Sequence, residues 1–339
     1  MPSDDLVRSD HDAPGSDSIF EDIEQVGEQL ADVRAGIGRV IFGQEEVVDE
    51  TLITLLSGGH LLLLGVPGLA KTRLVETLGT VLGLGSRRIQ CTPDLMPADI
   101  LGSEILEETE QGRAFRFIPG PVFTQVLMAD EINRASPRTQ SALLQAMQER
   151  EVSVAGQTHA LPKPFHVLAT QNPIEQEGTY PLPEAQLDRF LLQVNVDYPD
   201  PEAERQMLLV TTGLEDRTPS QVMDAAQLMR AQTLVRRLPV GESVVEAILA
   251  LVRSGRPGVS ERDEVNDWVA WGPGPRASQS LMLATRARAL LQGRVSPSID
   301  DVVALAPAVL RHRMALNFAA RAEGRTLDDV IDRLCEPFK

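Results

Sequence analysis

Apolar residues recur along the chain with two different spacings. From residue 18 to about residue 37 they fall every three or four positions, which predicts a helix with one apolar face. Residues 45–56 are expected to form a second helix, ended by the glycine pair at 58–59. Short apolar runs then follow, of the kind typical of strands buried on both faces of a parallel sheet. They lie at residues 61–64, 126–129, 165–169 and 191–196.

The pattern changes again after residue 197, where strand-like runs become scarce and helical spacing continues to the end. We therefore predict an α/β core with a parallel sheet over residues 18–197 and an all-helical lid domain over 198–339. Alternating polar and apolar residues predict two β-hairpins within the core, one ending near residue 119 and one turning at Gly156. Residues 1–17, rich in Asp, Ser, Pro and Gly, are expected to form a disordered acidic tail.

A glycine-rich loop joins the first buried strand to a helix, and residues 65–72 read Gly-Val-Pro-Gly-Leu-Ala-Lys-Thr. This layout is typical of a phosphate-binding loop, in which main-chain amides and a helix N-terminus face phosphate oxygens. Lys71 would neutralise the β- and γ-phosphates, and the Thr72 hydroxyl would bind Mg²⁺. Ala70 stands where glycine is usual, but alanine supplies an amide and tolerates a helical φ. A simple glycine turn between strand and helix is the alternative.

Two carboxylates follow the apolar run at 126–129. Asp130 and Glu131 would lie at the carboxyl end of a buried strand, the edge where open α/β sheets bind ligands. Asp130 would hold Mg²⁺ through its water shell, and Glu131 would polarise the attacking water. An acidic pair at a helix N-terminus beside Asn133 is the alternative. Together with the glycine loop, the pair predicts nucleotide binding.

Three further polar residues are candidates for the same chemistry. Asn172 follows another buried strand and could orient the hydrolytic water. Arg189 is either an arginine finger for a neighbouring subunit's γ-phosphate or the partner of Asp188 or Glu184 in a salt bridge. Arg276 begins a helix, where the dipole disfavours a cation, which indicates that it serves a ligand.

The composition narrows the classes of partner. The chain has 339 residues and a net charge of −17, from 49 acidic and 32 basic residues, which disfavours nucleic acid as a ligand. Its two cysteines fit a reducing compartment. The N-terminal residues lack the features of a signal peptide, and no apolar run approaches membrane-spanning length, so a cytoplasmic location without membrane insertion is expected. The basic residues at 311–313 are expected on a helix face or at a subunit contact.

Taken together, these motifs are similar to those of AAA+ ATPases, and more narrowly of the MoxR family. The similar segments are residues 43–44, 65–72, 93–102, 115–121, 129–135, 169–173, 187–190 and 275–277. The resemblance spans the chain from about residue 20 to its end, and alanine at position 70 is usual in this family. It implies a P-loop NTPase fold and a ring-forming, usually hexameric, ATPase that uses ATP and Mg²⁺. It also implies chaperone-like work on partner proteins, often ones with von Willebrand factor A domains.

The resemblance also assigns roles to residues. Lys71 and Thr72 correspond to Walker A, and Asp130 and Glu131 to Walker B. Asn172 corresponds to sensor 1, Arg189 to the arginine finger and Arg276 to sensor 2, which would report loss of the γ-phosphate to the lid. The nucleotide would contact Val40, Ile41, Gly65, Val66, Pro67, Gly68, Leu69, Ala70, Lys71, Thr72, Arg73 and Asp130. Ordinary core packing is the alternative for Val40 and Ile41.

Several alternatives remain open at this point. Arg134 is a second candidate for the interface arginine. The two hairpins would face the ring pore or the substrate, or else pack on their own domain. A DNA-processing motor shares these motifs, and a nucleotide-gated scaffold with little turnover would need the same binding site.

Overall fold

A computed structural model describes residues 16–109, 112–174, 178–213 and 219–339 of the chain. Most of the predicted acidic tail, residues 1–15, lies outside the described residues. The tail was predicted to end at residue 17 and the first helix to begin at residue 18, but α1 begins two residues before that and covers Ser16–Gly38.

A five-stranded parallel sheet forms the centre of the core, with the strand order β2-β5-β8-β1-β9. The strands are β1 (Leu61–Leu64), β2 (Ser86–Gln90), β5 (Val126–Asp130), β8 (His166–Gln171) and β9 (Leu192–Asn195). Three of the apolar runs recognised in the sequence become the buried central strands β1, β5 and β8, and the fourth becomes the edge strand β9, since helices cover both faces of the sheet.

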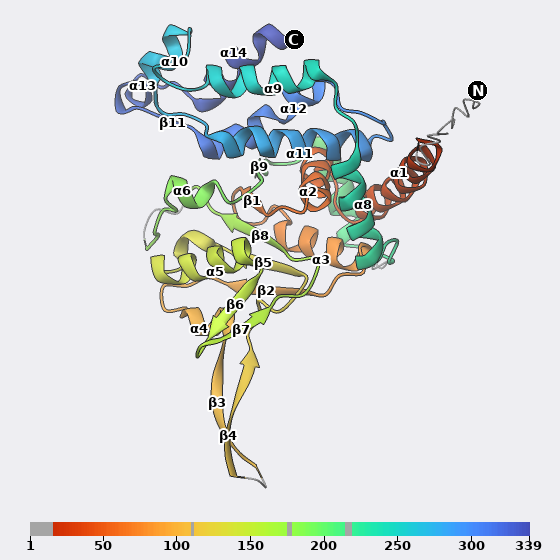
Figure 1. The fold of residues 1–339 in the computed structure, drawn as a ribbon, viewed down its shortest axis with the longest axis vertical. Helices are drawn as coiled ribbons and strands as arrows, with labels where there is room; N and C mark the ends of the chain where they lie inside the picture. Colours follow the sequence, from red (N-terminus) through yellow and green to blue (C-terminus); the bar gives the residue numbers. More distant parts are fainter. Residues whose placement is uncertain (1–15, 110–111, 175–177, 214–218) are drawn as a thin grey trace, which may run out of the picture.

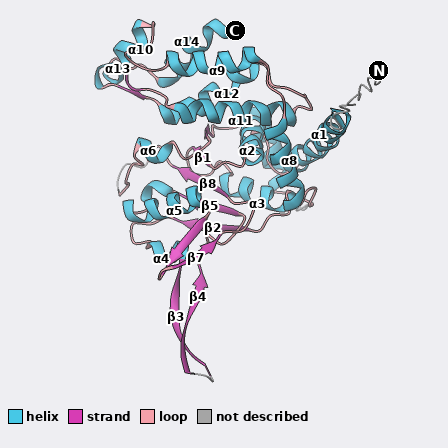
Figure 2. Cartoon of the chain, in the orientation of Figure 1, coloured by secondary structure: helices cyan, strands magenta, loops and turns pink. Residues whose placement is uncertain are grey.

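Alternate residues of each strand enter two separate apolar cores. Leu61 and Leu63 pack with α1, α2 and α3 on one face, while Leu62 packs with α5 on the other. These helices are α2 (Glu45–Leu56), α3 (Lys71–Val81) and α5 (Pro137–Glu149). Figure 2 shows the helices arranged around the sheet. The layered αβα architecture agrees with the predicted fold class.

Both predicted hairpins are present. Strands β3 (Gly102–Thr109) and β4 (Gly112–Pro119) form a long antiparallel ribbon after the short helix α4 (Pro97–Leu101). It projects from the end of the molecule opposite the helical region (Figure 1). Strands β6 (Glu151–Val154) and β7 (Gln157–Ala160) form the shorter hairpin. The Phe117 ring of the long hairpin stacks on His159 of the short one, with ring centroids 3.9 Å apart.

The C-terminal region is helical, with one addition to the prediction. Its helices, preceded by α6 (Glu184–Leu187), are α7 (Pro201–Thr211), α8 (Ala225–Arg237), α9 (Glu242–Ser254), α10 (Asp263–Trp268), α11 (Pro275–Leu291), α12 (Ile299–Leu310), α13 (Phe318–Ala322) and α14 (Leu327–Cys335). The strands β10 (Val269–Trp271) and β11 (Ala315–Leu316) pair in this region, which was expected to contain helices alone. They are too short for periodicity to reveal them. Within the described residues, no helix is both long and apolar enough to cross a membrane.

The basic residues at 311–313 were expected on a helix face or at a subunit contact, but two of the three are buried within the chain. They form a 3-10 turn after α12, in which His312 and Arg313 are 3% and 1% exposed. Both side chains form hydrogen bonds to the core loop before β9, Arg313 through its guanidinium and His312 through Nε2, and these partners are remote in sequence. Short-range patterns therefore could not show the burial.

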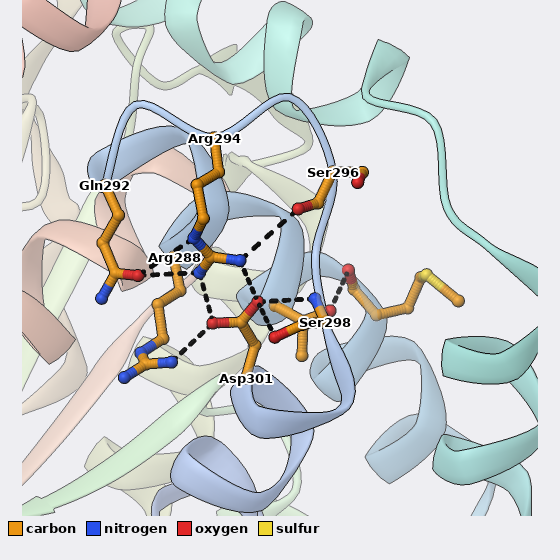
Figure 3. A network of polar contacts seen from close by, with 8 residues as sticks. Arg288, Gln292, Arg294, Ser296, Ser298 and Asp301 are labelled. Atoms are coloured by element: carbon orange, nitrogen blue, oxygen red, sulfur yellow. Dashed lines mark hydrogen bonds and ion pairs between the residues drawn. The ribbon is translucent and has the colours of Figure 1, made fainter.

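A buried carboxylate joins α11 to α12 (Figure 3). Asp301 is fully buried, and its two oxygens accept hydrogen bonds from Arg294 at 2.6 and 2.8 Å and from Arg288 at 2.5 Å. The Ser298 amide donates to the same carboxylate at 2.8 Å and so caps α12. Burial alone would raise the pKa of Asp301, but the hydrogen bonds from Arg294, Ser298 and Arg288 hold it below its ordinary value.

We expect Asp301→Asn to lower the free energy of unfolding by about 3 kcal/mol, because the two arginines lose a buried counter-ion. Ionised Asp301 stabilises the fold above the unfolded-state pKa, and this contribution disappears as the pH falls through the lowered folded-state pKa. Urea unfolding should therefore show a large difference from the wild type at neutral pH and a smaller one in acid. Asp300→Asn, at the exposed neighbouring position, is the control; an equal loss there would contradict this role for Asp301.

Candidate active site

The glycine loop connects the carboxyl end of β1 to α3, as predicted. A Cβ at Gly65 would lie 2.6 Å from the Val196 carbonyl oxygen, and Gly68 has a φ of +90°, so both positions require glycine. Ala70 has a φ of 56°, and the expectation of a helical φ was wrong. As the N-cap of α3 it lies outside the helix, in a left-handed conformation that costs a non-glycine residue about 1–2 kcal/mol.

Lys71 begins α3, and its side chain folds back over the loop. Its Nζ donates to the carbonyl oxygens of Gly65 and Val66, the latter at 3.1 Å. Burial lowers the pKa of the Lys71 amine, while the carboxylates of Asp130 and Glu131 oppose this shift. A polyphosphate bound here would give the ammonium a stronger partner than two neutral carbonyls.

Asp130 lies at the same edge of the sheet, because β5, β8 and β1 run parallel and end together. Its carboxylate accepts a hydrogen bond from the Thr170 hydroxyl on β8 and forms an ion pair with Arg88 on β2. The side chain therefore has a fixed orientation at the end of β5.

Glu131 follows in a strained backbone conformation, with a φ of 55°. The Thr170 hydroxyl accepts a hydrogen bond from the Glu131 amide at 2.9 Å, which supports this turn. The Glu131 carboxylate accepts hydrogen bonds from Gln90 at 2.8 Å and from Arg134 at 3.2 Å. In this arrangement, the side chain is held by neighbours within its own subunit.

Asn172 completes the polar edge. It follows β8, is 6% exposed, and its Oδ1 accepts a hydrogen bond from the Ile174 amide at 3.1 Å. This local turn leaves the amide group of Asn172 at the carboxyl end of β8, the strand between those that lead to Lys71 and to Asp130.

A cavity of about 650 Å³ opens beside the glycine loop, and residues 67–70 form part of its wall. Val40 and Ile41 line it, as does Arg73 from α3. Its remaining apolar wall comes from Leu69, Phe42, Tyr198, Met207 and Val210. The volume and the mixed lining suit a nucleobase and ribose whose phosphates reach the loop.

The oxygen donors at this edge fit Mg²⁺, which prefers one or two protein oxygens and keeps most of its water. Thr72 offers a hydroxyl on the first turn of α3, and Asp130 offers a carboxylate. No group of three or more His, Cys, Asp or Glu in the described part of the chain could hold a metal ion.

A second cavity, of about 280 Å³, lies at the opposite end of β1. Gly58, Gly59 and His60, which precede that strand, form part of its wall. We call it the arginine cavity, because it is lined by Arg150, Arg189, Arg236, Arg276 and Arg313. The structure thus brings Arg189 and Arg276 together, away from Lys71. Arg189 has no ion pair within the described residues, whereas Arg276 Nη1 lies 3.6 Å from Asp188 Oδ2.

Comparison with known proteins agrees with this geometry. Residues 60–192 match the ATPase family associated with various cellular activities (AAA), and residues 262–334 match the AAA lid domain. The chain is 43% identical over 330 residues to the chaperone MoxR1 of Mycobacterium tuberculosis, covering 96% of this chain and 85% of that protein. It is 32% identical over 297 residues to the protein MoxR of Methylorubrum extorquens, covering 83% and 85% of the two chains.

This chain belongs to the MoxR family of AAA+ ATPases. The fold agrees as well: the crystal structure of a candidate ATPase from Cytophaga hutchinsonii superimposes with a TM-score of 0.86 at 35% identity. That comparison covers 94% of this MoxR-family chain and 97% of the other.

Three residues of this MoxR-family site did not emerge from the sequence. Arg88 and Gln90 are on β2, and Thr170 is on β8; together they hold the two carboxylates at the end of β5, Asp130 and Glu131. The spacing of two of these residues in the sequence is a weak indication of their role. Arg88 and Gln90 are two residues apart on β2, so their side chains point to the same face of the sheet. β2 pairs with β5, the strand that ends in Asp130. Recognising them required the strand order, which the sequence does not state.

We expect Lys71→Met to weaken ATP binding by about 10- to 100-fold, because a hydrogen bond to a charged group contributes about 1.5–3 kcal/mol. Isothermal titration with ATP and magnesium measures this effect. Lys163→Met removes an exposed lysine elsewhere and is the matched control. Equal affinities of the two variants would reject the role of Lys71.

Proposed function

We propose that this chain is a Mg²⁺-dependent ATPase that works as a ring and uses hydrolysis to remodel partner proteins. The observation that carries this proposal is the convergence of Lys71, Asp130 and Glu131 at one edge of the sheet, beside a cavity large enough for a nucleobase. A phosphate tail lying across that edge would be within the field of the ammonium, the loop amides and the α3 N-terminus.

In the proposed reaction, Glu131 accepts a proton from water while the water oxygen attacks the γ-phosphorus. The bond between that phosphorus and the β–γ bridging oxygen breaks, and ADP and phosphate leave. Asn172 orients the water. Mg²⁺ held by Thr72 and Asp130 would supply charge neutralisation of the phosphates. Gln90 and Arg134 both donate to Glu131 Oε2 and orient the carboxylate, and Oε1 is the oxygen that would accept the proton.

The position of the arginine cavity supports an assembly in which each subunit completes its neighbour's site. The four residues of β1, which span roughly 13 Å, separate the cavity from the glycine loop. Arg189 and Arg276 would therefore act on the nucleotide of a second copy, whereas Arg134 contacts Glu131 of its own chain. A contact between two different faces of the same chain forms a ring when the rotation from one copy to the next closes. A hexamer is the ring size that the family resemblance implies.

The long β3–β4 hairpin is the proposed contact for client proteins, including ones with von Willebrand factor A domains. Leu106 and Phe115 pair across its strands and are 53% and 72% exposed. Its arginines, Arg113 and Arg116, are paired with Glu108 and Glu107. An apolar surface with neutralised cations suits a protein partner better than DNA. We place this activity in the cytoplasm, which the buried free thiols of Cys91 and Cys335 support.

We expect Glu131→Gln to lower the turnover number by at least about 100-fold, because general-base catalysis typically contributes 10²–10⁴-fold. Binding of ATP should persist, since Lys71 and the loop are unchanged. A steady-state phosphate-release assay and a titration with ATP measure the two quantities. Turnover of the variant at the wild-type rate would refute the assignment of Glu131. If the wild-type protein hydrolyses ATP but does not release a client protein in the presence of ATP, the remodelling function is refuted.

Arg189→Ala should lower turnover of the assembled protein by about 10³-fold or more, the range for an arginine finger. Mixing this variant with Glu131→Gln should restore activity, because each Arg189→Ala site can then receive Arg189 from a Glu131→Gln neighbour. Arg253→Ala, at an exposed position on α9, is the control and should retain wild-type turnover. Absence of complementation in the mixture would contradict action between subunits.

A further inference from the structure

Arg313 connects the helical region to the loop that carries the candidate finger, Arg189. Its side chain is 1% exposed and is among the largest fully buried side chains of the described residues. Nε donates to Asp188 Oδ1 at 2.8 Å, and Nη2 donates to the Phe190 carbonyl at 2.6 Å. Nη1 donates to the Leu191 carbonyl at 3.1 Å. The residues on both sides of Arg189 are therefore anchored by one guanidinium.

The same guanidinium is held from the helical side. Nη2 of Arg313 donates to Ser280 Oγ on α11 at 3.0 Å, and Nη1 donates to the Val309 carbonyl on α12 at 2.7 Å. Because α11 also begins with Arg276, both arginines of interest are attached to elements that meet at Arg313. A change in the angle of the helical region would thus reach the finger loop through this contact.

Asp188 interacts with two arginines, one of them buried and the other half-exposed. Its Oδ1 is bound by Arg313, which is buried, at 2.8 Å. Its Oδ2 lies 3.6 Å from Arg276, whose side chain is 50% exposed, so this second pair is long and open to water. Such an exposed pair contributes little to stability, and a stronger anion can displace it. Asp188 is also the one carboxylate among the described residues that line the arginine cavity.

We propose that the Asp188–Arg313 pair positions the arginine cavity for a polyphosphate held by a neighbouring copy of this chain. Arg313 is the permanent partner of Asp188, and Arg276 is the exchangeable one. When the neighbour's phosphates enter, Arg276 moves from Asp188 to a phosphate oxygen while Asp188 remains neutralised by Arg313. Arg189 needs no such release, because no described residue pairs with it. This inference rests on the function proposed above.

Asp188→Asn tests the inference with little change of shape, since the amide oxygen can still accept the hydrogen bond from Arg313. We expect turnover of the assembled protein to fall about tenfold, which corresponds to about 1.4 kcal/mol of lost transition-state stabilisation. The dissociation constant for ATP and magnesium at the variant's own site should change by less than about twofold, because its glycine loop and Lys71 are intact. A merely structural defect would weaken both quantities together.

Mixed assemblies separate positioning from misfolding. Asp188→Asn subunits mixed with Glu131→Gln subunits should regain turnover, since the latter supply an intact arginine cavity to the former. Arg313→Lys keeps the charge but loses the planar set of donors, and should show the same defect and the same rescue if it folds. Glu184→Gln removes an exposed carboxylate four residues from Asp188 and should behave as wild type.

The outcomes distinguish this inference from the proposed function. Wild-type turnover of Asp188→Asn, or reduced turnover without rescue in the mixture, would overturn the positioning role. If the mixture of Arg189→Ala and Glu131→Gln subunits shows no recovery of turnover, the proposed action between subunits is refuted, and the positioning role depends on that action. Rescue in both mixtures, with unchanged nucleotide affinity, is the result we expect.

Discussion

The parallel pairing of β5, β8 and β1 is the constraint on which the rest of the site depends. Main-chain hydrogen bonds hold these strands in one register, so the segments that follow them leave from a single edge. Lys71, Asp130 and Asn172 are far apart in the chain and become neighbours only for this reason. The same pairing aligns the opposite ends of the strands, where the arginine cavity opens.

The polar groups of this edge already have partners within the subunit. Lys71 donates to loop carbonyls, Asp130 is paired with Arg88, and Glu131 accepts hydrogen bonds from Gln90 and Arg134. These side chains are half-buried, and the contacts orient them toward one edge of the sheet. A bound phosphate would offer Lys71 a charged partner in place of the loop carbonyls. The left-handed backbone at Ala70 and Glu131 fits this view, since strain is often found where a site must be held ready.

Two clusters of buried ion pairs connect the elements of the helical region to one another and to the core. Asp301 binds Arg288 of α11 and Arg294 of the loop after it, and Arg313 joins the end of α12 to the core loop that contains Arg189. Removal of one partner from such a pair is destabilising because it leaves a buried charge unpaired, so these contacts hold the joined elements together. Motion of the helical region would therefore reach the arginine cavity through the contacts of Arg313.

The sequence by itself determined the layered fold and the order of its core elements, and it predicted a phosphate loop, because these follow from periodicity and from residues adjacent in the chain. It also singled out Asp130, Glu131 and Asn172 from their places after buried strands. The roles of Arg88, Gln90 and Arg313 depend on contacts between distant segments, and short-range patterns carry no trace of such contacts. Only the tertiary structure placed Arg276 beside Arg189 and away from Lys71, since the packing of α11 on the core decides which end of β1 its first turn reaches.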